Sequence, residues 1–152
     1  MVGTIRMKSY TRGFTLIELL VSISIIGIVV TIGIASFATI NKNSRDVKRK
    51  SDIEQLRSAF EMYRADSKAY PNAGCVSATC TAVDVQTLLT ELVGYMAAIP
   101  TDPNKLQKYW YRATQLVNGK YYGYCLSANV EGTVPTNTCV PDGGYNWGVS
   151  NP

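Results

Sequence analysis

The sequence predicts an α+β protein, in which a long N-terminal helix packs on a small antiparallel sheet. Three observations favour this class: an apolar run at residues 14–40, a helical pattern that follows it without Pro or Gly, and two β-rich runs around Asn118-Gly119. The 152 residues therefore divide into a short basic segment at 1–13, an apolar helix at 14–40, and a globular part at 41–152 that includes the second half of the helix.

The apolar run at 14–40 is long enough to cross a membrane. About 20 apolar residues span the hydrocarbon core as a helix, and Glu18 is the only charged residue in this run. A secretory signal peptide cut after Ala38 is the alternative, but the run exceeds the roughly 7 to 15 apolar residues of such peptides and contains an acid. We predict a membrane helix, in which an unpaired carboxylate would be costly.

Two signals disagree about the side of the membrane on which the globular part lies. All four cysteines follow the apolar run, and this even count predicts two disulfides in an oxidising compartment. The positive-inside rule favours the opposite orientation, because more basic residues follow the run than precede it. We give the cysteine signal precedence and expect the globular part to lie in the oxidising compartment. The basic residues before the run are Arg6, Lys8 and Arg12, and those after it are Lys42, Arg45, Lys48, Arg49 and Lys50.

The predicted disulfides join Cys75 to Cys80 and Cys125 to Cys139, because pairing cysteines that are close in the sequence places the fewest constraints on the fold. Two other pairings of the same cysteines are possible. A zinc site built from the four thiolates is a further alternative, but the spacings lack the usual C-x2-C form.

The helical pattern continues past residue 40 to about Ala65. Apolar residues recur at steps of three, four and three, which places them on one helix face. Charged residues with helical spacing occupy other positions and include two expected pairs. The apolar face comprises Ile53, Leu56, Phe60 and Tyr63, and the expected pairs are Asp46 with Lys50 and Glu54 with Arg57.

The basic triplet Lys48-Arg49-Lys50 could contact DNA or anionic lipid headgroups. Asp46 and Asp52 lie beside it in the sequence, so we interpret it as a solvated helix face. The net charge of +4 is modest and falls close to balance without residues 1–13. This charge distribution disfavours a dedicated nucleic-acid binder.

The globular part is expected to contain one short helix and a small sheet. Residues 83–95 predict a helix ending at Gly94, and a Pro-rich connector follows. The runs on either side of Asn118-Gly119 predict a β-hairpin, and residues 145–149 a third strand. The ten tyrosines of the chain, many of them in the hairpin, could form a ligand platform, but half-buried sheet positions with hydrated hydroxyls are the preferred interpretation.

The sequence offers little to catalysis or to cofactors. It contains no histidine, no nucleophile elbow and no Gly-rich phosphate loop. Asp102 and Asp142 could bind calcium, but no dense D-x-D-x-D spacing supports a site. We therefore predict no enzyme activity, no metal and no cofactor.

The stretch RGFTLIELLVSISIIGIVV resembles the N-terminus of type IV pilins and of the pseudopilins of type II secretion. The ordered set Gly-Phe-Thr-Leu-x-Glu at the start of a long apolar helix carries this resemblance. It covers about 20 residues closely, and the long helix with a cysteine-bearing head extends it more loosely over the chain. By this resemblance, residues 1–13 are a leader peptide, and a prepilin peptidase cuts between Gly13 and Phe14 and methylates the new amine of Phe14.

The resemblance also implies a role for Glu18 in filament assembly, and the physics agrees. The helix dipole favours an anion near a helix N-terminus, and the cationic amine of a neighbouring subunit can pair with the carboxylate in an apolar setting. An incorrect register would leave the acid unpaired. Glu18 is therefore expected to set the register between subunits.

One position departs from the family pattern, because many members carry a proline where this chain has Ala35. Gly27 and Gly33 are the nearest weak points of the helix. Either the helix loosens between them during assembly, or they allow close helix packing.

The expected protein is a filament subunit stored in the cytoplasmic membrane and assembled by a membrane platform into an extracellular or periplasmic filament of identical or related pilins. A surface pilus subunit is the first choice, because Cys125 and Cys139 resemble the pilin disulfide region. A secretion pseudopilin is the second choice. A secreted or membrane-anchored binding module that does not polymerise is the alternative from another class.

Overall fold

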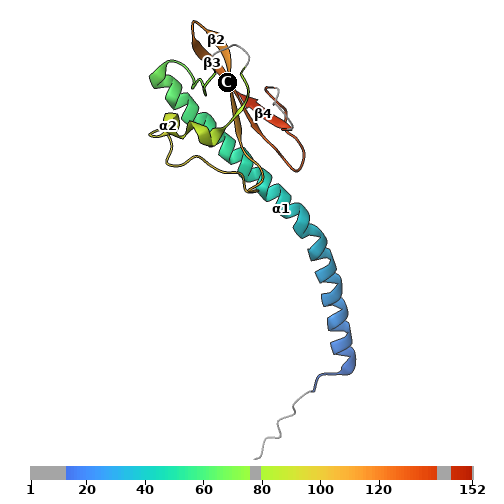
Figure 1. Cartoon of the computed structure of the whole chain (residues 1–152). Coiled ribbons are helices and arrows are strands. Elements are labelled where there is room, and N and C mark those ends of the chain that lie inside the picture. The colour runs from blue at the N-terminus through green and yellow to red at the C-terminus, as the bar shows by residue number, and fades with distance from the viewer. Residues whose placement is uncertain (1–12, 76–79, 140–144, 152) are drawn as a thin grey trace, which may run out of the picture. The chain divides into compact units, whose positions relative to one another are not determined.

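The computed structural model describes residues 13–75, 80–139 and 145–151. The chain forms two compact units, Met1–Thr39 and Ile40–Pro152. The helix α1, Leu16–Ser67, runs through the described part of the first unit and begins the second (Figure 1). The predicted α+β class, with a long N-terminal helix and a small antiparallel sheet, is confirmed.

The helix α1 ends two residues later than the sequence pattern predicts. Its last turn closes with a hydrogen bond of 2.8 Å from the backbone N–H of Lys68 to the carbonyl of Arg64. Lys68 has a φ of 61° and so takes the left-handed conformation that commonly terminates helices. The chain then reverses into Tyr70, which forms an isolated bridge with Tyr121 of the sheet.

The sheet has four antiparallel strands in the order β1-β2-β3-β4. Its centre is the predicted hairpin, in which Asn118 and Gly119 connect two strands with φ values of 49° and 75°. Two successive positive φ angles define the turn type that Asn-Gly favours. The strands are β1 Val83–Asp84, β2 Trp110–Val117, β3 Lys120–Ala128 and β4 Trp147–Ser150, and β4 corresponds closely to the third strand predicted at 145–149.

The prediction of one helix over residues 83–95 is wrong. The structure has the edge strand β1, then a 3₁₀ turn η1, Val85–Leu88, and the short helix α2, Leu89–Leu92. Asp84 causes the break, because it pairs with Trp110 in the sheet while its carboxylate accepts a 3.0 Å hydrogen bond from the backbone N–H of Gln86. A residue in extended conformation that caps the next turn cannot itself be helical.

The core of the second unit lies between the sheet and the second half of α1. Three of the four predicted apolar helix residues are fully buried there, and Phe60 stacks on Tyr111 with ring centroids 4.7 Å apart. Tyr63, the fourth, lies at the edge of the core and contacts the ring of Tyr95. The predicted face is therefore correct. The three buried residues are Ile53, Leu56 and Phe60.

Candidate functional site

The start of α1 is a closed hydrogen-bonded turn between Thr15 and Glu18. The backbone N–H and the hydroxyl of Thr15 donate to one carboxylate oxygen of Glu18, at 2.8 and 2.7 Å. The N–H of Glu18 in turn donates to the Thr15 hydroxyl oxygen at 3.3 Å. This reciprocal arrangement is a capping box. The Glu18 carboxylate therefore has hydrogen-bond donors within its own chain, which the sequence analysis missed although Thr-x-x-Glu is the usual signature.

Gly13 and Phe14 come directly before this turn. Both are exposed, and the residue Phe14 has a relative accessibility of 78%. Arg6, Lys8 and Arg12 of the basic segment lie outside the described residues. In the described part, an accessible Gly-Phe bond is thus followed at once by the capped helix.

The first half of α1 presents apolar side chains to its surroundings on every side. An 18-residue window in α1 has a mean hydropathy of 2.5, and none of that window is buried within the protein. By length and composition this helix can cross a membrane. The large apolar side chains exposed here include Leu16, Ile17, Leu19, Leu20, Ile25, Ile26, Ile32, Ile34 and Phe37.

Gly27 and Gly33 lie within this apolar surface, and α1 is helical through both of them and through Ala35. A Cβ atom built on either glycine would meet no heavy atom within 4 Å. Neither glycine is therefore required by packing within the subunit. Both expectations, a loosened helix and a close approach of another helix, stay predictions.

The second unit contains a buried ion-pair cluster centred on Arg49. Its guanidinium is fully buried and forms two parallel hydrogen bonds to Asp102, Nε to Oδ2 at 2.8 Å and Nη2 to Oδ1 at 3.0 Å. Its Nη1 contacts Asp46 at 2.7 Å and Glu131 at 3.0 Å. The prediction of a solvated basic triplet is therefore wrong for Arg49, although Lys48 and Lys50 are exposed. The cluster joins α1 to the loops before β2 and after β3.

Asp46 and Glu131 complete this cluster. Asp46 accepts backbone hydrogen bonds from Glu131 and Gly132. Its ion-pair partner is Arg49 and not the expected Lys50. Burial alone would raise the pKa of Asp46, but these N–H groups and the guanidinium outweigh it and lower the pKa. Hydrogen bonding to Arg45, with help from Arg49, lowers the pKa of Glu131 to about 2. The other expected pair, Glu54 with Arg57, is present at 2.9 Å.

Asp102 is held by Arg49, and it also accepts a 2.7 Å hydrogen bond from the N–H of Asn104. Its carboxylate therefore neutralises a guanidinium, which argues against the calcium alternative at this residue. Asp142, the other residue considered for calcium, lies outside the described residues. Within the described ranges no group of three acidic or thiol side chains is placed to hold a metal ion.

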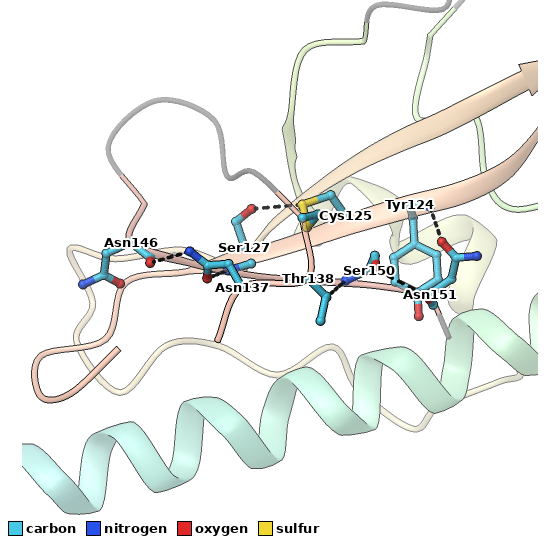
Figure 2. The surroundings of a disulfide bond; sticks show 10 residues. Tyr124, Cys125, Ser127, Asn137, Thr138, Asn146, Ser150 and Asn151 are labelled. Atoms are coloured by element: carbon cyan, nitrogen blue, oxygen red, sulfur yellow. Dashed lines mark hydrogen bonds between the residues drawn. A yellow bond between two sulfur atoms is a disulfide. The ribbon is translucent and has the colours of Figure 1, made fainter. Parts of the chain in front are cut away.

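Both expected disulfides are present in the structure, Cys75 to Cys80 and Cys125 to Cys139. The second bond ties the segment after β3 back to that strand, on the face of the sheet opposite to Tyr124, which packs on Phe60 of α1. The Ser127 hydroxyl lies 3.8 Å from the Cys125 sulfur (Figure 2).

The segment next to Cys139 runs along the edge of β4. The N–H of Thr138 donates to the carbonyl of Gly148 at 3.0 Å, and the Thr138 hydroxyl accepts from the N–H of Ser150 at 2.6 Å (Figure 2). Asn137 accepts a further bond from the N–H of Gly148 at 2.8 Å. The disulfide and these bonds together cover an otherwise unpaired sheet edge.

Most tyrosines of the sheet are core residues rather than a surface platform. Tyr111, Tyr121 and Tyr124 are at most 2% exposed. The hydroxyl of Tyr111 donates to the carbonyl of Pro71 at 2.7 Å, and that of Tyr109 to the buried Asp52 at 2.7 Å. Both sequence-based interpretations, the ligand platform and the half-buried position with a hydrated hydroxyl, are wrong for these residues.

Comparison with known proteins finds one matching family and several similar proteins. The family described as "Prokaryotic N-terminal methylation motif" matches residues 8–34. The chain is 32% identical to the type II secretion system core protein G of Escherichia coli (strain K12), over 95% of this chain and 97% of the relative. It is 27% identical to the protein of the same name from Vibrio cholerae, over 91% and 85% of the two chains.

A fimbrial protein is also similar, over a shorter stretch. The type IV major fimbrial protein FimA of Dichelobacter nodosus is 39% identical over 62 residues, which is 41% of this chain and 40% of the relative. No solved structure matches the chain.

A capped, exposed apolar helix joined to a small α+β head defines a class of proteins that are anchored in a membrane as precursors and polymerise through that helix. The chain belongs to the pilin and pseudopilin family. It is a structural subunit of a pilin-like filament.

Proposed function

We propose that this chain is a secretion-type pseudopilin. The likeness that extends over nearly the whole chain is to proteins named type II secretion system core protein G, whereas the fimbrial likeness covers 41% of it. In this proposal the precursor is held in the cytoplasmic membrane with its head outside, is cut by a prepilin peptidase, and is drawn by a membrane platform into a filament. The filament contains copies of this chain or related pilins.

The observation that supports the processing and assembly steps of this proposal is the arrangement at the start of α1. An exposed Gly13-Phe14 bond precedes a capped turn that holds Glu18, and an unbroken apolar helix follows. Cleavage after Gly13 would leave a cationic amine on Phe14, four residues from the acid. In a filament, the amine of one subunit can pair with Glu18 of another, away from water, where the attraction is strong and an unpaired charge is costly.

The apolar surface of α1 can be kept out of water both in the stored subunit and in the filament. Each side chain exposed on the isolated subunit would be buried against lipid before assembly and against other helices afterwards, and burial of a large apolar side chain contributes roughly 1.5–3 kcal/mol relative to water. Repeated contacts that do not close into a ring build an open helical fibre. The family is structural, and we propose no catalytic role and no cofactor.

Intact-mass analysis of the mature protein tests this proposal. A chain that begins at Phe14 and carries one additional methyl group supports processing as a pilin-like subunit. A chain that begins at Thr39, or at Met1, contradicts it, and the first of these results would favour the secreted binding module.

A surface pilus subunit is the second candidate, favoured by the Cys125–Cys139 disulfide and by the fimbrial relative. Deleting the gene separates the two candidates. Loss of exported proteins from the medium with surface fibres intact supports the secretion filament. Loss of surface fibres with export intact supports the pilus. Independently of the deletion, long surface fibres in the unmodified strain at normal expression also support the pilus.

A further inference from the structure

Three lysines at the beginning of the second unit have exposed side chains that point to no partner. Lys42, Lys48 and Lys50 follow the apolar run closely, and among the described residues no hydrogen bond or ion pair is found for any of them. We call these three residues the lysine collar. The positive charge of the collar is thus available to a partner outside the protein.

The acids that should neutralise these lysines are turned away from them. Asp46 is 5% exposed and engaged by Arg49 and by two backbone N–H groups, and Asp52 is 4% exposed and accepts from Tyr109. Arg45, on the rim, is paired with Glu131. The next acid along α1, Glu54, is paired with Arg57. The sequence-based reason for treating the triplet as a self-neutralised face therefore fails, because the two acids are buried while Lys48 and Lys50 are exposed.

The collar surrounds the helix just beyond its apolar run. At 1.5 Å per residue, the Cα atoms of Lys42, Lys48 and Lys50 lie about 3, 12 and 15 Å along the axis from Ile40. Lys48 and Lys50 are separated by roughly 200° around the axis, so they project from opposite sides of α1. Lysine side chains are long and flexible, and the Debye length at physiological salt is about 8 Å. Charges so placed act within the reach of a membrane surface.

We propose that the lysine collar binds anionic phospholipid headgroups in the leaflet next to the head while the subunit is stored in the membrane. The proposal rests on the membrane-inserted stage of the proposed function. Its partner follows from charge complementarity and from the position of the collar directly after a membrane-spanning helix. Duplex DNA fits less well, because three lysines around one helix form neither a stripe nor an element that enters a groove.

The test uses the full chain reconstituted in phosphatidylcholine vesicles. A donor fluorophore is attached at Ser44→Cys, and energy transfer is measured to trace amounts of phosphatidylglycerol or phosphatidylcholine that carry the same label on an acyl chain. We expect transfer to the anionic lipid to exceed transfer to the zwitterionic lipid by about twofold or more at low salt. This preference should shrink at about 1 M salt, where the Debye length is only ~3 Å.

Two triple variants with the same change in net charge make the result specific. Lys42→Gln/Lys48→Gln/Lys50→Gln should bring the ratio of the two transfers close to one. Lys68→Gln/Lys105→Gln/Lys120→Gln removes three exposed lysines elsewhere in the head and should leave the ratio unchanged. Near-ultraviolet circular dichroism checks that both variants keep the packed head.

Several outcomes would overturn the proposal. Equal energy transfer to both lipids in the Ser44→Cys chain that keeps all its lysines would show that the collar has no preference for anionic headgroups. An equal loss of the preference for anionic lipid in both triple variants would show that net charge, and not the collar, causes the preference. Transfer to neither lipid would mean that the chain is not inserted, which contradicts the membrane stage itself. Saturable binding of duplex DNA that depends on the collar lysines, without any lipid preference, would replace lipid by nucleic acid.

Discussion

Arg49 and Asp102 are 53 residues apart in the sequence and form a fully buried, two-pronged ion pair with both side chains at 0% exposure. Arg49 lies on α1, and Asp102 lies in the connector between α2 and β2. The pair therefore fixes this connector against the helix at a point where the apolar core ends. A buried guanidinium needs such partners, because an unpaired buried charge is strongly destabilising.

Arg49→Met should destabilise the head by about 3–5 kcal/mol, because it leaves the carboxylates of Asp102 and Asp46 buried without their cation. Denaturant unfolding followed by the fluorescence of Trp110 and Trp147, both in the head, measures this loss. Lys108→Met is the matched control, since Lys108 pairs with Asp84 at a site where its side chain is 59% exposed. That change should cost less than about 1 kcal/mol. An equal loss of unfolding free energy in the two variants would contradict the structural role of the cluster.

Acid should weaken the head through Glu131 and Asp46. Both carboxyl groups have a lowered pKa in the folded protein, that of Glu131 about 2. A carboxyl group whose pKa is lower in the folded protein stabilises the fold at pH values above its pKa in the unfolded chain. That unfolded-state pKa is about 4.3 for Glu and 3.9 for Asp. This contribution is lost as the pH falls through the folded-state pKa. The unfolding midpoint should be steady down to about pH 5 and then decline towards pH 2.

Glu131→Gln should lower the midpoint at neutral pH and flatten the acid decline, because one titrating group of the cluster is gone. Glu91→Gln, outside the cluster, should leave the decline as it is. The measurement is the thermal midpoint in detergent micelles across this pH range. A decline of unchanged slope in Glu131→Gln would assign the acid sensitivity to other carboxylates.

The sequence predicts α1 and the hairpin well because their signals are local. The apolar period of three and four residues defines the buried face of α1, and Asn118-Gly119 defines the turn. The Arg49 cluster could not be predicted, since its partners come from distant segments, and adjacent acids made the triplet resemble a solvated face. The same limit explains the error at residues 83–95, where Val83 and Asp84 pair with β2. The Thr15–Glu18 turn was predictable, because its signature lies within four residues.

Gly123 on β3 should not tolerate a side chain. A Cβ atom at this position would lie 2.5 Å from the hydroxyl oxygen of Thr114 and 2.9 Å from the side-chain carbon Cδ of Gln115. Gly123→Ala therefore forces these β2 side chains to move and should cost about 1–3 kcal/mol. Denaturant unfolding measures the cost.

Thr114→Ala removes the closest atom and should recover part of the loss when combined with Gly123→Ala. Thr114→Ala alone provides the reference for this comparison. Additive costs of the two changes would show that the strain does not arise between these two positions.

Glu18→Gln separates the charge of this residue from its capping role. Glutamine also forms capping boxes, so the turn with Thr15 and the helix content of the subunit should be preserved. Only the negative charge is lost, and the amine of a neighbouring subunit would then be left without its counter-ion in an apolar environment. Loss of that pairing should reduce filament yield by about tenfold or more.

The reciprocal change is Thr15→Val, which removes the hydroxyl but keeps the carboxylate. Weakening the cap should cost about 1 kcal/mol of helix stability and reduce filament yield less than Glu18→Gln does, because the charge is still available for pairing. Sedimented filaments quantified after gentle shearing, with membrane-inserted subunit as the reference, provide the measurement. Normal yield in Glu18→Gln together with poor yield in Thr15→Val would mean that Glu18 acts by shaping the helix start, and the proposed pairing between subunits would have to be given up.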